Sequence, residues 1–151
     1  MRHSRKGSRG KLDICRREFG VNCQLSAKPQ LIYDGICNLC TSAVRFLSTL
    51  DRRGSLHYVP SQQLSSKIRA KYGLTEGALQ GQMHLIMTDD SLASGAFATA
   101  RVVELLTPFH AAARLLRTPP ARLVYNWIAR RRYGLFGCRD TCYVPHSRAR
   151  S

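Results

Sequence analysis

Short apolar runs alternate with stretches of helical periodicity along the middle of this chain. Residues Leu31-Ile32-Tyr33 form a strand-like apolar run, and the turn residues Asp34-Gly35 end it. Apolar residues then recur at spacings of three and four, which places them on one face of a helix. These residues are Leu39, Ala43, Phe46, Leu47 and Leu50. The pattern predicts a strand that leads directly into a helix, with a tight turn between the two.

The same alternation continues through the next fifty residues. Three more strands are expected, at residues 56–60, 83–87 and 91–93. Asp89-Asp90 would form the turn of a hairpin between the last two strands. A helix is expected from about Ser61 to Tyr72, with Gly73 ending it. The order of strand, helix, strand and helix indicates an α/β fold.

The second half of the chain is predicted to be mainly helical, with helices over residues 96–106, around 109–116 and from 119 to about 132. Thr118 followed by Pro119 is a typical start for the last helix. Its apolar side is expected to carry Leu123, Val124, Trp127 and Ile128, which places Trp127 in the core. The alternative is an exposed basic and aromatic surface of Tyr125, Trp127 and Arg130-Arg131-Arg132.

The chain has 151 residues, of which 44% are hydrophobic, and this favours a single domain with one core. Residues 1–29 lack periodicity and are expected to be a basic, disordered arm, followed by one domain over residues 30–146 and a tail over 147–151. The most apolar stretches are interrupted by arginines, so we expect no transmembrane helix.

The net charge of +15 is concentrated at the two ends of the chain. Residues 1–29 contain 8 basic and 2 acidic side chains, residues 30–105 contain 7 and 6, and residues 106–151 contain 9 and 1. Such ends are able to contact anionic surfaces, but nothing here predicts a specific nucleic acid. No apolar run typical of a signal peptide follows the basic start, so we expect a cytoplasmic protein. The composition of the arm also loosely fits an organellar transit peptide.

Cys37 and Cys40 form a C-x-x-C pair at the expected junction of strand and helix. Backbone N–H groups at a helix N-terminus stabilise a thiolate and lower a thiol pKa from about 8.5 toward roughly 3.5–7.5. Cys37 is therefore the candidate nucleophile, and we expect its side chain to be exposed. Cys40 lies one turn deeper and suits the resolving role, in which it breaks a mixed disulfide.

A single C-x-x-C pair is also typical of half a zinc site. A second pair would come from Cys138 and Cys142, or from Cys15 and Cys23 in the arm. A zinc-stabilised binding module built on Cys37, Cys40, Cys138 and Cys142 is thus the alternative to a redox enzyme. A third hypothesis is a basic peripheral protein that acts through surface contacts alone.

Asp34 precedes Cys37 by three residues, and its carboxylate has two possible roles. Its carboxylate would accept a proton from a thiol during exchange, or it would form an Asx-turn by accepting the backbone N–H of Ile36 or Cys37. Both roles place Asp34 in the site. Gly35 is expected to supply backbone freedom. The histidines 57, 84 and 110 show no pattern typical of metal ligands and are expected to be ordinary, partly buried side chains.

The segment LIYDGICNLCTSAVRFLSTLD resembles the opening of the DCC family of thiol-disulfide oxidoreductases, named for the residues of a D-x-x-C-x-x-C signature. The stretch from Val59 to Gln63 is similar to the second strand of that family and its Gln-Ser region. IARRRYGLFGCRDTCYVP resembles its closing segment. The resemblance covers about residues 30–146.

This resemblance implies a thioredoxin-like fold, with a central mixed sheet of about four strands flanked by helices and extra C-terminal helices. It implies that Cys37 is the attacking thiol, Cys40 the resolving thiol and Asp34 the signature carboxylate. Tyr33, Gly35, Arg139, Asp140 and Cys142 are expected to support the site. Cys138 is an addition to the family pattern. We therefore ask whether Cys138 and Cys142 form a second redox relay or are idle thiols.

The function expected from these features is thiol-disulfide exchange of the protein-disulfide reductase type. Cys37 would attack a disulfide in a protein or small-molecule substrate, and Cys40 would then displace the product. No cofactor is required for this chemistry. The electron donor is not specified by the sequence.

Overall fold

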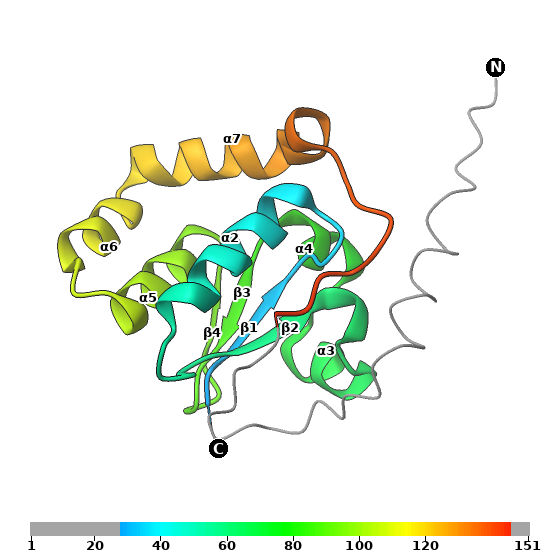
Figure 1. Ribbon diagram of the computed structural model, residues 1–151, viewed down its shortest axis with the longest axis horizontal. Helices are drawn as coiled ribbons and strands as arrows, with labels where there is room; N and C mark the ends of the chain where they lie inside the picture. Colours follow the sequence, from blue (N-terminus) through cyan, green and yellow to red (C-terminus); the bar gives the residue numbers. More distant parts are fainter. Residues whose placement is uncertain (1–27, 146–151) are drawn as a thin grey trace.

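The computed structural model describes residues 28–145, and within them four strands form one mixed sheet in the order β2-β1-β3-β4 (Figure 1). The strands are β1 (Gln30–Tyr33), β2 (His57–Pro60), β3 (His84–Ile86) and β4 (Leu92–Ser94). β1 pairs in parallel with β2 and antiparallel with β3, and β3 pairs antiparallel with β4. The expected α/β class and the β3–β4 hairpin are confirmed. Residues 1–27 of the arm expected at 1–29, and the tail at 147–151, lie outside the described residues.

The described part of the chain contains six α-helices and one 3₁₀ helix. They are α2 (Asn38–Leu50), η1 (Ser61–Gln63), α3 (Ser66–Tyr72), α4 (Glu76–Gly81), α5 (Ala96–Leu106), α6 (His110–Leu116) and α7 (Pro119–Phe136). The single helix predicted for residues 61–72 was wrong, because Ser65 begins a new helix by accepting the Ile68 N–H at 3.4 Å. Thr75 starts α4, a helix the sequence analysis missed, in the same way. Gly73 ends α3 in the left-handed conformation, as predicted.

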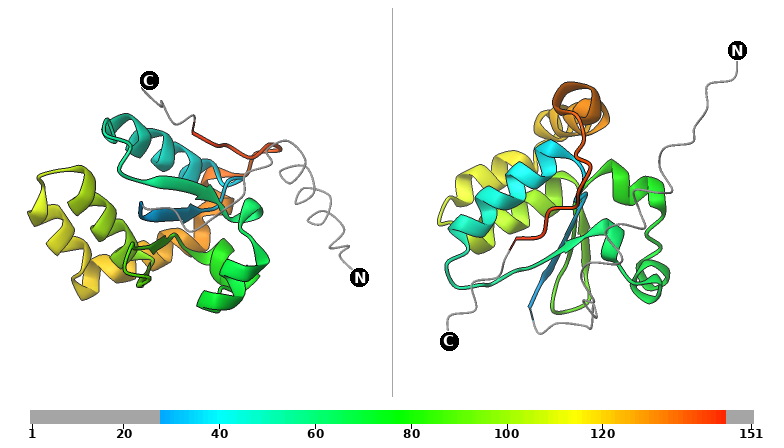
Figure 2. Two further views of the ribbon diagram at one scale, coloured as in Figure 1. Left: turned by 90° about the horizontal axis from the view of Figure 1, so that it is seen from below. Right: turned by 45° about the vertical axis from the view of Figure 1, so that its right-hand side comes forward.

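The helices cover both faces of the sheet because residues of β1 alternate between two cores (Figure 2). Leu31 and Tyr33 face α2 and α5, and they pack with Cys37, Cys40 and Val44 of the first core. Ile32 faces the opposite way, into a second core with residues of α3, α4 and the segments that flank them. The cysteines therefore lie at the end of β1, inside the core that α2 and α5 cover.

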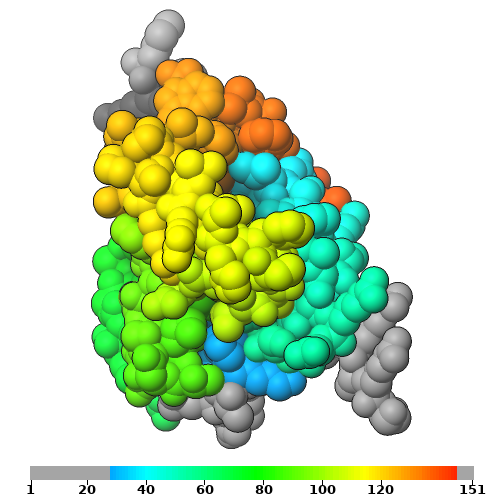
Figure 3. Space-filling view, turned by 90° about the vertical axis from the view of Figure 1, so that its left-hand side faces the viewer, coloured from blue at the N-terminus to red at the C-terminus, as the bar shows by residue number. Residues whose placement is uncertain are grey.

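Helix α7 lies across the top of the molecule in Figure 1 and contacts α2, α5 and α6. Its inward face is set by Tyr125, Ile128, Ala129 and Arg132, and Arg132 is only 3% exposed. Leu123, Val124 and Trp127 are 71%, 58% and 52% exposed, so the expectation that they face the core was wrong. Figure 3 shows α6 and the first turns of α7 at the surface of this side of the molecule.

The residues after α7, numbers 137–145, form a closing segment that returns to the start of α2 (Figure 2). The Arg139 N–H donates to the Ile36 carbonyl at 2.7 Å, and the Tyr143 N–H donates to the Gly35 carbonyl at 3.1 Å. The closing segment therefore runs directly over the turn that carries the first cysteine. Among the helices of residues 28–145, none is long and apolar enough to cross a membrane.

Candidate active site

Cys37 and Cys40 lie where the sequence predicted, at the start of the first helix after β1. Cys37 is the N-cap residue of α2 with an extended backbone, and its carbonyl accepts the Thr41 N–H at 2.9 Å. Cys40 lies in the first turn of the same helix. Both thiols are free. The expectation that Cys37 is exposed was wrong, because Cys37 is 0% exposed and Cys40 is 4% exposed.

The two thiols differ in acidity because one stabilises the other. The Cys40 thiol donates a hydrogen bond to Cys37, and this is the main reason that the pKa of Cys37 falls to about 6. Burial opposes this shift, while the backbone N–H groups of Cys40 and Leu39 and the charge of Arg132 support it. The same hydrogen bond and burial raise the pKa of Cys40. Cys37 is thus the thiolate of the pair at neutral pH.

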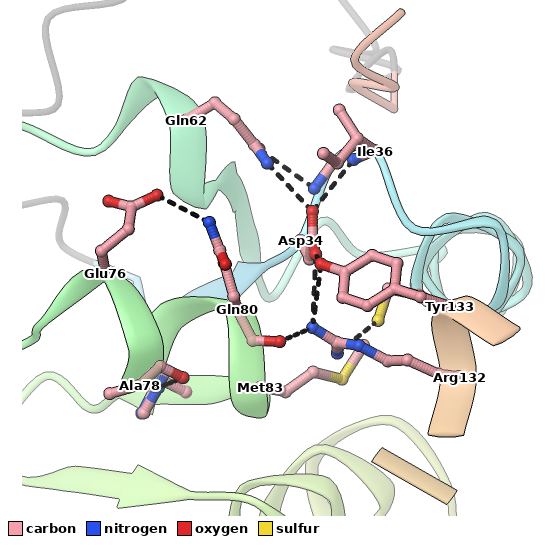
Figure 4. Close-up of polar contacts among 12 residues, drawn as sticks. Asp34, Ile36, Gln62, Glu76, Ala78, Gln80, Met83, Arg132 and Tyr133 are labelled. Atoms are coloured by element: carbon pink, nitrogen blue, oxygen red, sulfur yellow. Dashed lines mark hydrogen bonds and ion pairs between the residues drawn. The ribbon is translucent and has the colours of Figure 1, made fainter. Parts of the chain in front are cut away.

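Asp34 is 1% exposed and occupies the centre of the polar network that Figure 4 shows. One carboxylate oxygen, Oδ1, accepts the Ile36 N–H at 3.1 Å and the Gln62 Nε2 amide at 2.9 Å. The contact with Ile36 is the Asx-turn considered above. The other oxygen, Oδ2, accepts hydrogen bonds from Arg132 and from the hydroxyl of Tyr133. The Asx-turn therefore uses only one side of the carboxylate, and the other side faces α7.

Arg132 connects the carboxylate to the second cysteine, and Figure 4 shows its guanidinium beside Asp34. Its Nη1 lies 3.0 Å from the Cys40 Sγ, and its Nη2 lies 3.2 Å from the Asp34 Oδ2. The carbonyl of Gln80, in α4, also accepts a hydrogen bond from Nη2. A guanidinium with fixed orientation is thereby placed beside a buried sulfur atom, where its charge is weakly screened.

Arg132 was not predicted as a site residue, and it was assigned to a basic surface with Arg130 and Arg131. The reason is that the three arginines look alike in sequence, whereas only Arg132 lies on the inward stripe of α7. The spacing of Tyr125, Ile128, Ala129 and Arg132, at intervals of three, one and three, was the available signal. Tyr133 was also missed, and burial together with the hydrogen bond to Asp34 raises its pKa.

Gly35 is required by close packing and not by its backbone angles, which corrects the expectation of backbone freedom. A Cβ at this position would lie 3.0 Å from the Pro60 Cβ, 3.0 Å from the Gln62 Oε1 and 3.4 Å from the Cys142 Sγ. Gly35 is absent from the glycines with positive φ among the described residues. Its N–H donates to the Gln62 Oε1 at 3.1 Å, which orients the amide that binds Asp34. The turn thus packs directly against the end of β2.

Two of the remaining predicted support residues, Tyr33 and Arg139, fix the closing segment. Tyr33 is fully buried, and its hydroxyl donates to the carbonyl of Tyr143. Arg139 Nε donates to the Asn38 Oδ1 at 3.1 Å. Asp140 is exposed and does not belong to the network around Asp34. Hydrogen bonds therefore hold the closing segment to residues that precede Cys37 in the chain and to residues that follow it.

The four cysteines of the proposed zinc site are not brought together as metal ligands. Residues 28–145 contain no group of three or more His, Cys, Asp or Glu side chains placed to hold a metal ion. Cys142 is disulfide-bonded, whereas Cys37, Cys40 and Cys138 are free. Cys15 and Cys23, the other candidates, lie outside the described residues. Cys142 is therefore not an idle thiol, and a relay from Cys142 to the active pair stays a prediction.

The strand-to-helix turn carries a buried C-x-x-C pair, in which one thiol has a lowered pKa and the second sulfur lies beside a guanidinium. These features define a dithiol redox site on an α/β scaffold. Residues 31–138 match the model of the DCC1-like thiol-disulfide oxidoreductase family. The chain belongs to this family, and its four-stranded sheet flanked by helices is consistent with the expected thioredoxin-like domain. The matched span ends at Cys138, so Arg139, Asp140 and Cys142 lie beyond it.

Two curated relatives share this similarity. The uncharacterized protein YuxK of Bacillus subtilis is 29% identical over 119 residues, which cover 76% of this chain and 85% of the relative. The DCC family protein At1g52590, chloroplastic, of Arabidopsis thaliana is 26% identical over 121 residues, which cover 76% of this chain and 69% of the relative. No solved structure matches the chain.

Proposed function

We propose that this protein reduces disulfide bonds in a protein or small-molecule substrate, with Cys37 as the attacking thiol and Cys40 as the resolving thiol. The observation that carries the proposal is the asymmetry of the pair: the pKa of Cys37 is lowered to about 6 by the hydrogen bond from Cys40, whereas that of Cys40 is raised. Near neutral pH one sulfur is a thiolate and the other keeps its proton. This is the state that begins thiol-disulfide exchange.

In the first step the Cys37 thiolate attacks one sulfur of the substrate disulfide. A bond forms between Cys37 and that sulfur, and the other substrate sulfur leaves as a thiolate that takes a proton from solvent. Once Cys37 is part of a mixed disulfide, it no longer accepts a hydrogen bond from Cys40. The main cause of the raised pKa of Cys40 is then removed, so Cys40 becomes easier to deprotonate.

In the second step the Cys40 thiolate attacks Cys37, releases the remaining substrate thiol and leaves a Cys37–Cys40 disulfide. Arg132 supports this step, because its Nη1 lies 3.0 Å from the Cys40 Sγ and stabilises negative charge there. Asp34 acts through Arg132, since its Oδ2 accepts from the guanidinium and the tyrosine hydroxyl. We assign Asp34 the role of positioning residue. The two electrons given to the substrate come from the dithiol, and no cofactor takes part.

An external thiol donor must then reduce the Cys37–Cys40 disulfide for a new cycle. The cytoplasm, where reducing thiol pools are maintained, is the location we propose for this chemistry. The chloroplastic relative from Arabidopsis makes an organelle the alternative.

The test is a disulfide-reductase assay on the full chain with insulin as substrate and dithiothreitol as donor. Wild-type protein should accelerate the reduction, and Cys37→Ser should fall to the uncatalysed rate. Cys40→Ser should trap a disulfide on Cys37, because the resolving thiol is absent. A Cys37→Ser variant with wild-type activity would contradict the proposal. Arg131→Met changes an exposed arginine next to buried Arg132 and should keep the wild-type rate, so it is the control for substitutions of Arg132 in this assay.

A further inference from the structure

Cys138 of the closing segment lies directly opposite Cys37. The two residues form an isolated antiparallel bridge. The bonds beside it run from the Asn38 N–H to the Gly137 carbonyl at 3.4 Å and from the Arg139 N–H to the Ile36 carbonyl at 2.7 Å. These bonds flank Cys37 and Cys138 and do not join them, so the two cysteines form a non-hydrogen-bonded pair. In such a pair the Cα atoms are about 4.5 Å apart and the side chains lie on the same side.

This register is compatible with a disulfide bond. Disulfides join cysteines whose Cα atoms are about 4.4–6.8 Å apart, and the spacing of a non-hydrogen-bonded pair, about 4.5 Å, falls within that range. Cys37 and Cys138 are both free thiols in this structure. The backbone is already in place.

The three thiols differ sharply in access to solvent. Cys37 is 0% exposed and Cys40 is 4% exposed, and both belong to the first core, against which Tyr143 of the closing segment packs. Cys138 is exposed. A protein disulfide approaching the surface therefore meets Cys138 before it meets either member of the C-x-x-C pair. The buried thiolate and the exposed thiol are adjacent, which is the arrangement a relay requires.

We propose that Cys138 is a third redox-active thiol, which takes the disulfide from the substrate at the surface and passes it to Cys37. This inference rests on the proposed function and extends it by naming the residue that contacts the substrate. The substrate class it favours is an exposed disulfide in a protein or peptide. Such a disulfide is too bulky to enter the covered turn and is accessible to a surface thiol.

The relay consists of three exchanges that balance. The Cys138 thiolate attacks the substrate disulfide, which forms a mixed disulfide and releases the first substrate thiol. The Cys37 thiolate attacks the Cys138 sulfur, which forms a Cys37–Cys138 disulfide and releases the second substrate thiol. Cys40, after losing its proton to solvent, attacks Cys37 and regenerates the Cys138 thiol. The substrate gains two electrons from the Cys37–Cys40 pair and two protons from solvent, and Cys40 returns one proton to solvent, because Cys37 begins as a thiolate.

The relay predicts an intermediate that can be isolated when the last exchange is blocked. Reduced full-length Cys40→Ala should be treated with oxidised glutathione and then alkylated, and its disulfides mapped by mass spectrometry. A peptide linking Cys37 to Cys138 is the expected product. It should be lost in Cys40→Ala/Cys138→Ala, which shows that the linkage needs the third thiol. Glutathione accumulating on Cys37 of Cys40→Ala, with Cys138 still open to alkylation, would overturn the proposal.

Turnover separates this inference from the function on which it rests. With insulin as substrate, Cys138→Ala should slow the reduction by about tenfold or more, because exchange then waits for local opening of the closing segment. Thr141→Ala, an exposed neighbour in the same segment, is the matched control and should keep the wild-type rate. Wild-type turnover in Cys138→Ala would overturn the relay and leave the reductase intact. Absence of Cys37-dependent turnover in the wild type would overturn both.

Discussion

The Nη1 of Arg132 lies 3.0 Å from the Sγ of Cys40, and this contact joins the last long helix to the first turn of the helix that carries the two thiols. The same guanidinium pairs with Asp34. Its charge lowers the pKa of both thiols, and at Cys40 it opposes the rise that the hydrogen bond to Cys37 and burial cause. The resolving sulfur has a buried positive charge beside it at the moment when it must become a thiolate.

Loss of Arg132 should therefore reduce both stability and the rate of resolution. Arg132→Met leaves the Asp34 carboxylate buried without its positive partner, and breaking such a pair costs about 3–5 kcal/mol. The exposed control Arg131→Met should stay within about 0.5 kcal/mol of the wild type. Urea unfolding gives the first comparison. The lifetime of the disulfide that Cys37 forms before Cys40 displaces it, measured by quenched mass spectrometry, gives the second comparison and should lengthen only in Arg132→Met.

If Arg132→Met is too unstable for kinetics, Arg132→Lys provides the same test in a folded protein. A lysine retains the charge but has one donor group, so it cannot hold Asp34 and Cys40 simultaneously with the geometry of a guanidinium. Resolution should be slower than in the wild type and faster than in Arg132→Met. Equal lifetimes in the wild type and Arg132→Lys would show that charge alone suffices and that the orientation is not required.

The acidity of Cys37 should be visible in a thiolate titration. Absorbance of the thiolate near 240 nm should rise with a midpoint near the pKa of about 6 and should be missing in Cys37→Ser. In Cys40→Ala the midpoint should move to higher pH, because the hydrogen bond that contributes most to the low pKa is lost. An unchanged midpoint in Cys40→Ala would mean that the helix N-terminus and Arg132 produce the acidity without Cys40.

Sequence reasoning predicted the strands, the first helix and the cysteine turn because these features depend on local patterns. The apolar run of β1, the turn residues after it and the periodicity of α2 are contiguous in the chain. The antiparallel hairpin of β3 and β4 was found for the same reason. Gly73 was also predicted correctly as a helix end, since an αL residue after a helix is a local requirement.

Contacts between distant segments could not be predicted in this way. Arg132 is 98 positions from Asp34 and 92 from Cys40, and no periodicity reports such a pairing. The burial of Cys37 escaped prediction because it depends on the closing segment, which returns from the far end of the domain. The outward face of α7 shows a further limit: its apolar stripe is real, but the helix presents that stripe to the surface and buries an arginine.

Gly35 should not tolerate a side chain, whereas Gly77 in helix α4 should tolerate one easily. A Cβ at Gly35 meets the Pro60 Cβ and the Gln62 Oε1 at 3.0 Å each, so Gly35→Ala should destabilise the fold by about 1–3 kcal/mol, as overpacking does. Displacing Gln62 also disturbs its bond to Asp34. Gly77, within α4, has open space, and Gly77→Ala should stabilise by about 0.5–1 kcal/mol. Thermal unfolding of the two variants measures the change in stability, and equal changes would contradict the packing argument.

His84 should make stability depend on pH below neutrality. It is 2% exposed, its Nε2 donates to the Ala78 carbonyl at 3.1 Å, and its Nδ1 lies 2.8 Å from the Ser94 hydroxyl, which suits a neutral ring. Burial lowers the pKa of His84 below its usual 6.5, with the Ala78 carbonyl opposing the shift. Between the folded and unfolded pKa values the unfolded chain binds more protons, so the free energy of unfolding falls as pH drops below about 6.5.

The measurement is urea unfolding of wild type and His84→Leu between pH 7.5 and pH 5, with values chosen to bracket the usual histidine pKa of about 6.5. His84→Leu loses two hydrogen bonds and should be less stable at every pH, but its stability should fall less steeply on acidification. Other titrating groups, Cys37 among them, are present in both proteins, so the difference between the two slopes isolates His84. Parallel curves would show that His84 is protonated in the folded protein as readily as in the unfolded chain, and its burial would then have no electrostatic cost.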